Sequence, residues 1–227
     1  MRSFTIEGGL TVALRRSARA RRMVLRVPQS GGEPVLTLPS HVALAEGQVF
    51  AQSRRDWLEA ALARRPGAQV VAAGAMLPVE GQPLRITPAP VKAPQVREGA
   101  LLVPEGRPVA PVVAAFMKQQ ALARLRPACD GFAARLGRAP RAIVLRDTRS
   151  RWGSCTSDGR LMFSWRLAMA PPEVLAYVAA HEVAHLAHMD HSPRFWAAVE
   201  ALMPGHAPQR AWLKREGGAL MLWRFRD

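Results

Sequence analysis

The feature that most constrains this chain is the stretch at residues 179–191, which reads AAHEVAHLAHMDH. It holds four histidines and two acidic residues among apolar neighbours. The preceding PPEVLAYV supplies prolines and an acid that suit the first turn of a helix. Burying imidazoles and a carboxylate is unfavourable unless each group gains a partner. We therefore expect a helix that is buried on several sides and whose ionisable groups form a site.

His181, Glu182 and His185 form the sequence H-E-x-x-H. Positions four apart on an α-helix share one face and lie about 6 Å apart along the axis, so both imidazoles can bind one cation. In this motif the histidines bind zinc, and the glutamate is the general base for a water. The same pattern also arises by chance in helices rich in Ala, Glu and His. The apolar flanks favour the metal site, with Zn²⁺ as the cofactor.

A hydrolytic zinc site needs a third protein ligand and an open position. On a straight helix His188 lies about 10.5 Å along the axis from His181, which is too far for a shared ion. His191 follows the residues MD, where a break is expected, and Ser192-Pro193 suit the start of another helix. Because such a turn brings His191 back toward the helix, we predict it as the third ligand.

The remaining polar residues near the motif have two interpretations each. His188 either faces a ligand or the substrate, or is a polar residue at a fraying helix end, and the second is favoured. Asp190 either orients a ligand histidine through its free ring nitrogen or is a solvated acid. His41 and His206 lie in sequence contexts with Pro and Gly and are expected at the surface.

A β-hairpin is predicted before the motif. The strand sequence AIVLRDT starts at residue 142, and SRWGSCTSDGRLMFSWRLAM contains two β-prone runs separated by SDGR, whose Asp-Gly pair suits a tight turn. The small residues Gly153 and Ser154 allow close approach, so a peptide could add along this strand and reach the zinc. Four nearby side chains are expected to pack rather than react: Trp152, Cys155, Trp165 and Tyr177.

The first residues of the chain predict strands and one helix. Residues 10–38 indicate a hairpin or meander around QSGGEP, with RRSARARR as its basic turn. That basic run is interpreted as a solvated loop, with a binding patch as the alternative. Residues 40–65 have helical spacing of apolar positions, so we predict a helix that ends before Pro66 and places Trp57 in a core.

The middle of the chain separates two lobes. Residues 68–110 are rich in Pro and Gly and indicate short strands with turns at VEGQ and VREG. Residues 111–137 carry a long helical pattern that Pro127 kinks or divides. The expected fold class is α+β, with an N-terminal β-rich lobe containing a helix at 1–110 and a second lobe at 111–227, together forming one compact unit.

The composition restricts partners and location. The net charge is +15, but arginine supplies 29 of 32 basic residues, and the excess is spread: 11 basic minus 5 acidic residues before residue 66, and 21 minus 12 from there on. Such a spread supports solubility or weak polyanion attraction more than a dedicated nucleic-acid groove. Cys129 and Cys155 form no C-x-x-C pair, and no segment approaches ~18 consecutive apolar residues. We expect a cytoplasmic protein without disulfides or a membrane partner.

The segment RWGSCTSDGRLMFSWRLAMAPPEVLAYVAAHEVAHLAHMDHSPRFW resembles the signature of the YgjP-like metallopeptidases, zincin-fold relatives of SprT-like proteins. R-W-G-S-C, the W-R-L strand, H-E-x-x-H and H-S-P-x-F-W occur in that order, and TVALRRSARARRMVLRV and TLPSHVALAEGQVFAQSRRDWL are also similar to that family. The resemblance implies a zinc-dependent hydrolase of polypeptides, with His181, His185 and His191 as ligands and Glu182 as base. It also implies a zincin-like second lobe, in which an antiparallel β-hairpin packs on the H-E-x-x-H helix.

The leading hypothesis is therefore a zinc metallopeptidase. Zinc would polarise the scissile carbonyl and lower the pKa of water to roughly 7, while Glu182 takes the water proton and passes it to the leaving amine. The net charge motivates a second hypothesis, a nucleic-acid-associated protein or a protease acting on DNA-bound proteins. A third is a noncatalytic protein with a structural metal, although such sites usually have four protein ligands. The sequence leaves the substrate and the oligomeric state open.

Overall fold

The computed structural model describes residues 2–28, 31–64, 67–148 and 150–225. In these ranges it has six α-helices, one short 3-10 helix and several small sheets, which confirms the α+β class. Contacts within the chain divide it into two compact units, Met1–Ala68 and Gln69–Asp227. None of the described helices combines the length and the apolar character needed to cross a membrane.

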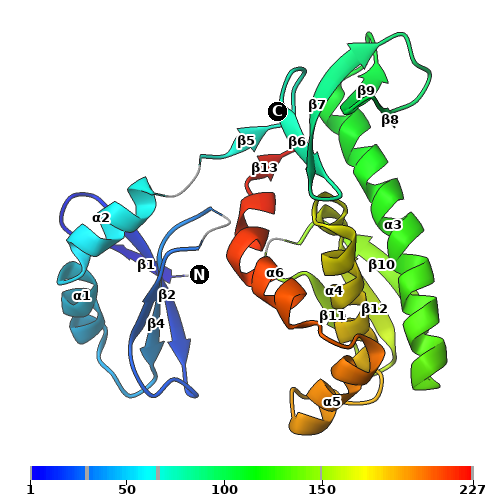
Figure 1. Cartoon of the computed structure of the whole chain (residues 1–227). Helices are drawn as coiled ribbons and strands as arrows, with labels where there is room; N and C mark the ends of the chain where they lie inside the picture. Colours follow the sequence, from blue (N-terminus) through cyan, green and yellow to red (C-terminus); the bar gives the residue numbers. More distant parts are fainter. Residues whose placement is uncertain (1, 29–30, 65–66, 149, 226–227) are drawn as a thin grey trace. The chain divides into compact units, whose positions relative to one another are not determined.

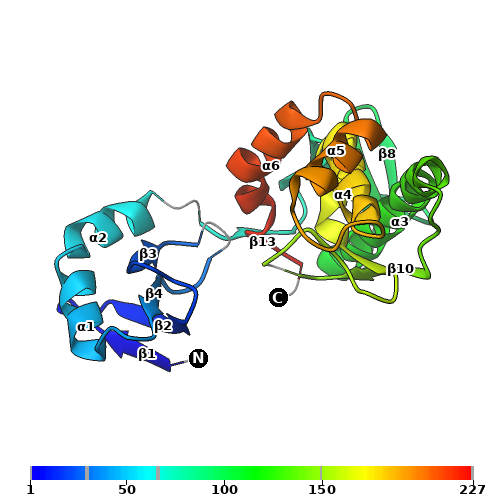
Figure 2. The same ribbon diagram turned by 90° about the horizontal axis from the view of Figure 1, so that it is seen from below.

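The first unit is a four-stranded sheet with two helices against one face (Figure 2). The strand order is β1-β2-β4-β3, with β2 and β4 parallel and the two outer pairs antiparallel. The elements are β1 (Arg2–Thr5), β2 (Thr11–Ser17), β3 (Val24–Arg26), β4 (Val35–Pro39), α1 (Leu44–Gln52) and α2 (Arg55–Ala63). The buried members of its core are Ile6, Val12, Leu36, Ala51 and Leu58.

Three predictions for this unit are wrong. Residues 40–65 form two helices, because the helical conformation is interrupted at Ser53 and Arg54. The predicted helix end before Pro66 lies outside the described residues. Leu58 is the buried residue of α2, whereas the neighbouring Trp57 lies off that face of the helix and is 50% exposed, so it is not in the core. The basic run RRSARARR closes no hairpin, because β2 and β3 both pair with β4 instead of with each other. The antiparallel pairing of β3 with β4 is as predicted.

The strands of residues 69–104 belong to the second unit, whereas the sequence analysis predicted the boundary between the two lobes after residue 110. The physical reason is a shared core, because the buried Leu77, Ile86 and Leu101 belong to the same apolar cluster as the following helices. Backbone hydrogen bonds also cross that division. The N–H groups of Glu80 and Gly81 donate to the carbonyls of Ala168 and Met169 at 2.9 and 3.0 Å.

These strands form a four-stranded sheet of order β6-β7-β9-β8 and a two-stranded pair. Their bounds are β5 (Gln69–Val70), β6 (Met76–Val79), β7 (Gln82–Ala89), β8 (Gln95–Arg97) and β9 (Ala100–Pro104), and β5 pairs with the late β13 (Trp223–Arg224). Both predicted turns are confirmed. Glu80-Gly81 and Glu98-Gly99 have positive φ at both residues, which two-residue hairpins favour.

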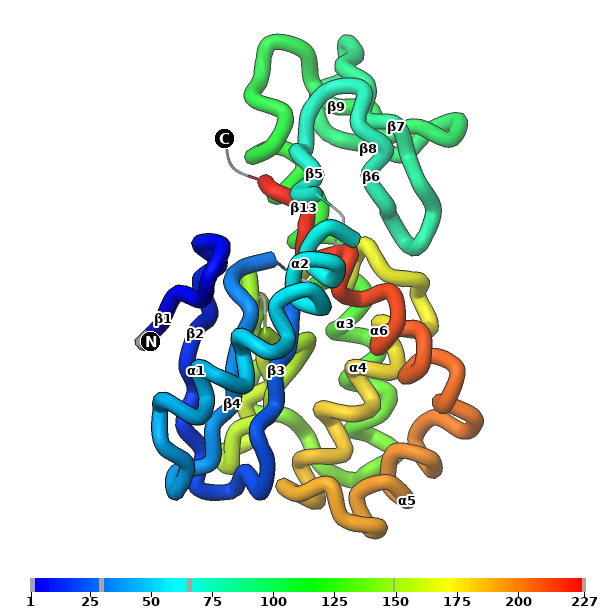
Figure 3. Tube along the Cα trace, turned by 90° about the vertical axis from the view of Figure 1, so that its left-hand side faces the viewer, coloured from blue at the N-terminus to red at the C-terminus, as the bar shows by residue number. Residues whose placement is uncertain are grey.

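The helix that carries the H-E-x-x-H motif lies at the centre of the second unit. It is α4 (Pro172–Ala184), and it lies between α3 (Val109–Leu136) and α6 (Ala207–Leu220) in Figure 1, in contact with both. It also contacts α5 (Pro193–Leu202) and β11 (Gly153–Cys155). Most of its side chains are buried, which confirms a helix that is covered on several sides. Figures 1 and 3 show the β6–β9 sheet at one end of this unit and α5 at the other.

The predicted elements around α4 are confirmed except for the W-R-L strand, because Trp165, Arg166 and Leu167 lie in a 3-10 helix whose side chains are buried. Strand β11 pairs antiparallel with β12 (Arg160–Ser164), which pairs parallel with β10 (Ala142–Arg146), and the 3-10 helix η1 (Trp165–Met169) follows. Pro172 starts α4, and Ser192 is the N-cap of α5 with Pro193 next. Pro127 lies inside α3 without dividing it.

Arg166 is a buried cation that joins three segments of the second unit. Its side chain is 1% exposed and donates to both carboxylate oxygens of Asp147, at 2.6 and 3.3 Å. It also donates to the carbonyls of Leu220 and Trp223, at 3.1 and 2.9 Å. These bonds connect η1 to the segment before β11 and to the end of the chain. A planar fork of donors satisfies this arrangement, whereas a single ammonium cannot.

We predict that Arg166→Lys lowers the free energy of unfolding by roughly 2–3 kcal/mol, because hydrogen bonds from a charged donor to buried acceptors are lost. Chemical denaturation of the whole chain measures the change. Arg160→Lys is the matched control, since Arg160 is exposed and bonds to an exposed Asp158, so its effect should stay within about 0.5 kcal/mol. Equal effects of the two substitutions would show that Arg166 does not join these segments.

Candidate metal centre

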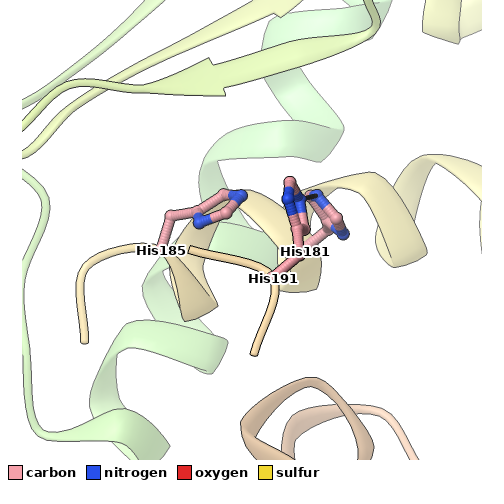
Figure 4. A group of neighbouring side chains, drawn as sticks. All are labelled: His181, His185 and His191. Carbon is pink, nitrogen blue, oxygen red and sulfur yellow. Dashed lines mark hydrogen bonds between the residues drawn. The ribbon is translucent and has the colours of Figure 1, made fainter. Parts of the chain in front are cut away.

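Three histidine side chains converge at the C-terminal end of α4 (Figure 4). His181 lies in the last turn, His185 is the C-cap, and His191 comes from the loop before α5. One ligand nitrogen of each ring lies within 4.8 Å of those of the other two. In Figure 4 the rings of His181 and His191 lie beside each other, with His185 across from them. The structure therefore brings together the three predicted ligands.

The loop between α4 and α5 returns His191 to the helix end. The chain bends at Met189 and Asp190, where a turn is predicted. Asp190 Oδ1 accepts from the backbone N–H of Ser192 at 3.2 Å, and Ser192 Oγ accepts from the N–H of Phe195 at 3.5 Å. Asp190 is exposed, and its bond to Ser192 stabilises the turn. Within the described structure it forms no hydrogen bond to any of the three histidines.

The nitrogens of the cluster fit a tetrahedral metal. Nε2 of His181 and Nε2 of His191 are 3.3 Å apart. Two nitrogens on a tetrahedral zinc, each ~2.0–2.1 Å from the ion, are separated by about 3.3–3.4 Å. The ring of His185 bonds through Nδ1 to the backbone carbonyl of His188 at 2.9 Å, so Nδ1 carries the proton and Nε2 keeps its lone pair. His188 thus contributes its carbonyl to the centre, and its ring is not part of the cluster.

Aromatic side chains of α5 support the three imidazoles. Phe195 is fully buried and stacks on His185, with ring centroids 4.3 Å apart at 27°. The same ring lies 4.9 Å from His181 and 4.8 Å from His191. Trp196 lies 5.9 Å from the ring of His191 and stacks on it at 29°. These contacts limit the rotation of all three imidazoles. The sequence analysis did not predict this role for Phe195 and Trp196.

The environment of the cluster favours neutral imidazoles. Burial lowers the pKa of His181 to about 3, and His185 and His191 lower it further as neighbouring groups. Burial also lowers the pKa of His185. Metals bind the neutral form of histidine. Nδ1 of His181 is buried and has no hydrogen-bond partner among the described residues.

Glu182 is a buried carboxylate held against a glycine. Its side chain is 5% exposed, and burial raises its pKa to about 8, although the positive charge of Arg151 opposes this shift. A Cβ placed on Gly153 would lie 2.5 Å from Cγ and Oε1 of Glu182. The close approach expected at Gly153 is therefore to this side chain, and any larger residue would displace the carboxylate.

Two cavities meet at Glu182. One has a volume of about 240 Å³ and includes Cys155, Met189 and all three histidines in its lining. The other has a volume of about 230 Å³ and lies toward the start of β11, with Trp152 and Leu213 in its lining. Gly153, His181 and Glu182 line both. The carboxylate thus faces open space on two sides.

The four side chains that were expected to pack differ in how deeply they are buried and in whether they line a cavity. Trp165 is buried in the core, whereas Trp152 is half-buried and lines a cavity. Cys155 and Cys129 are free thiols, and burial raises the pKa of Cys155 to about 11. Tyr177 is 5% exposed, and burial raises its pKa, so it packs as predicted. It also lines the cavity beside Trp152.

One histidine prediction is wrong. His206 is 9% exposed instead of lying at the surface, while His41 is exposed as expected. The ring of His206 stacks on Tyr177 with centroids 5.5 Å apart at 3°, and its Nδ1 lies 2.9 Å from Oε2 of Glu200. Long-range packing between α6 and α4 buries this ring, and the local sequence carries no signal for it.

Comparisons with known proteins identify the family to which this chain belongs. The model of the YgjP-like metallopeptidase domain matches residues 21–216. Among solved structures, the crystal structure of the metallopeptidase zymogen of Pyrococcus abyssi abylysin is similar at 20% identity and a TM-score of 0.37, over 41% of this chain and 95% of that chain. No curated protein matches the chain at a significant level. Because the family match spans most of the chain, the protein belongs to the YgjP-like metallopeptidase family and is a hydrolase.

Proposed function

We propose that the protein is a zinc-dependent metallopeptidase that hydrolyses peptide bonds, with His181, His185 and His191 as ligands and Glu182 as general base. The observation that carries this proposal is the convergence of three ligand nitrogens within 4.8 Å beside a buried carboxylate. Membership in a metallopeptidase family supports the same reaction class.

Zinc is the metal that this donor set favours. Three imidazole ligands and no carboxylate or thiolate among them suit Zn²⁺. A catalytic zinc has three protein ligands and one open position, and the cavity beside the three histidines leaves room for that position. When bound, the ion supplies a Lewis acid for the carbonyl oxygen and lowers the pKa of a water.

Glu182 is positioned to move a proton. Its carboxylate lines both cavities and forms no hydrogen bond within the described part of the chain. In its ionised form it can accept a proton from the attacking water and pass it to the nitrogen of the leaving amine. Contact with Gly153 limits the positions that the carboxylate can take.

The proposed layout is zincin-like, with the hairpin β11–β12 beside α4 and all proposed ligands within the lobe at 111–227. In the described sheet β11 pairs with β12 alone, so its other edge is open. Ser164 N–H donates to Trp152 O, and Thr156 N–H donates to Arg160 O. Antiparallel pairing alternates, so the backbone groups of Gly153 and Cys155 point to the open edge. A polypeptide substrate can add there as a further strand.

A noncatalytic protein with a structural metal is the alternative. Structural zinc sites are closed by four protein ligands. Here the ligand group comprises three histidines next to an open cavity, which favours catalysis over a structural role.

We predict that Glu182→Gln keeps stoichiometric zinc but cleaves peptides at least about 100-fold more slowly, because the amide cannot accept the proton. Elemental analysis measures the metal, and mass spectrometry of a degenerate peptide mixture measures cleavage. Glu173→Gln is the matched control, since this glutamate is exposed in the first turn of the same helix and should leave both unchanged. His191→Ala should lose the metal.

Two results would contradict the proposal. A Glu182→Gln variant that cleaves at the wild-type rate would remove Glu182 as the base. A wild-type protein that holds zinc and cleaves nothing in the mixture would favour the structural metal.

Gly153→Ala is predicted to impair the same step without removing a chemical group. The added methyl must displace the Glu182 carboxylate, which should lower the rate of cleavage roughly 100-fold and the free energy of unfolding by about 1–3 kcal/mol. Zinc content should not change. Gly131→Ala is the control, because a Cβ there meets nothing within 4 Å, and this variant should cleave at the wild-type rate. Normal cleavage by Gly153→Ala would show that the contact does not position the base.

A further inference from the structure

The cavity at the start of β11 adjoins the cavity that is lined by all three histidines. Its volume is about 230 Å³, and its lining comprises Trp152, Gly153, Tyr177, Val178, His181, Glu182 and Leu213. Apart from the two residues of the proposed metal centre, the side chains are aromatic or aliphatic. The cavity thus offers an apolar wall directly beside the proposed base.

This wall is built from three elements and is held in place by packing. Trp152 precedes β11, Tyr177 and Val178 lie one turn before His181 on α4, and Leu213 comes from α6. A Cβ on the buried Gly217 would lie 3.1 Å from Cζ2 of Trp152, so the indole packs closely on α6. The ring of Tyr177 stacks on the buried His206. Rigid walls of this kind favour a pocket that exists before a ligand enters.

The direction of a bound peptide follows from strand pairing. Antiparallel pairing is more stable per residue than parallel pairing and is two- to three-fold more common. A peptide antiparallel to β11 has its N-terminal part near Cys155 and its C-terminal part near Trp152. Because Glu182 lies between the two cavities, the residue that follows the scissile bond lies at the Trp152 side.

We infer that this cavity is a specificity pocket that binds the apolar side chain of the residue immediately after the scissile bond. The inference rests on the proposed function, because it assumes that peptide hydrolysis occurs at Glu182. An apolar cavity of about 150 Å³ is sufficient for a benzene molecule, so the pocket has room for the side chain of leucine or phenylalanine. Acidic side chains are disfavoured there because the lining includes the carboxylate of Glu182.

The first experiment measures cleavage of a degenerate peptide library by zinc-replete enzyme, with cut sites identified by mass spectrometry. Leucine or phenylalanine after the cut should exceed alanine by roughly tenfold or more, since each missing methylene in an apolar pocket reduces the rate. Leu213→Ala should shift the preference toward larger aromatic residues, and Leu213→Phe should shift it toward smaller ones. Leu145→Ala is the matched control, because Leu145 is also half-buried against the same core but does not line the pocket.

The outcomes separate this inference from the proposed function. No cleavage of any peptide would contradict the proposed function itself. Cleavage without an apolar preference after the cut, or with the preference before it, would overturn the pocket assignment while leaving the enzyme in place. A preference that Leu213 substitutions leave unchanged would also overturn it.

A second measurement does not depend on catalysis. L-phenylalaninamide, added to the metal-free protein, should shift the indole N–H resonance of Trp152 in a ¹H–¹⁵N spectrum, because the ring of the probe enters the pocket beside it. L-alaninamide at the same concentration should leave the resonance unchanged, and Trp152→Phe assigns the signal. Equal responses to the two amides, or no response to either, would contradict an apolar pocket at this position.

Discussion

Burial of ionisable groups on one apolar helix is the constraint on which the second unit depends. Helix α4 is covered by α3, α5, α6 and β11, yet it carries Glu182, which is 5% exposed, and it ends at the half-buried His181 and the buried His185. Desolvation makes such groups costly unless the surroundings use them. Phe195 packs against three imidazoles, and Gly153 leaves space for the carboxylate. The same features that make the helix unfavourable as a plain core element therefore support the proposed centre for metal and proton chemistry.

Much of this centre could be predicted because its signals are local. The i, i+4 spacing of His181 and His185 is a property of any helix, and Ser192-Pro193 marks a helix start wherever it occurs. Together they require the chain to turn before α5, and that turn returns His191. The Glu-Gly turns and the β11–β12 hairpin were predictable because each turn contains a glycine with positive φ, which other residues rarely adopt.

The features that were not predictable depend on contacts between distant segments. The strands before residue 110 belong to the second unit because their apolar faces share a core with η1 and α3, and no local pattern records this. His206 is buried by stacking on Tyr177, and Leu213 completes a pocket with Trp152, although each pair is far apart in the sequence. Trp57 is exposed because α2 turns the adjacent Leu58 toward the core of the first unit, and the apolar pattern alone did not distinguish the two positions.

We propose that the three histidines form an open metal centre whose free side faces the Glu182 carboxylate. Anomalous diffraction at the zinc absorption edge, from crystals of the zinc-loaded chain, tests it most directly. We expect one zinc ion at about 2.0–2.1 Å from Nε2 of His181, His185 and His191, with no fourth protein ligand. Zinc bound elsewhere, or closed by a fourth ligand such as Cys155 or Glu182, would contradict it.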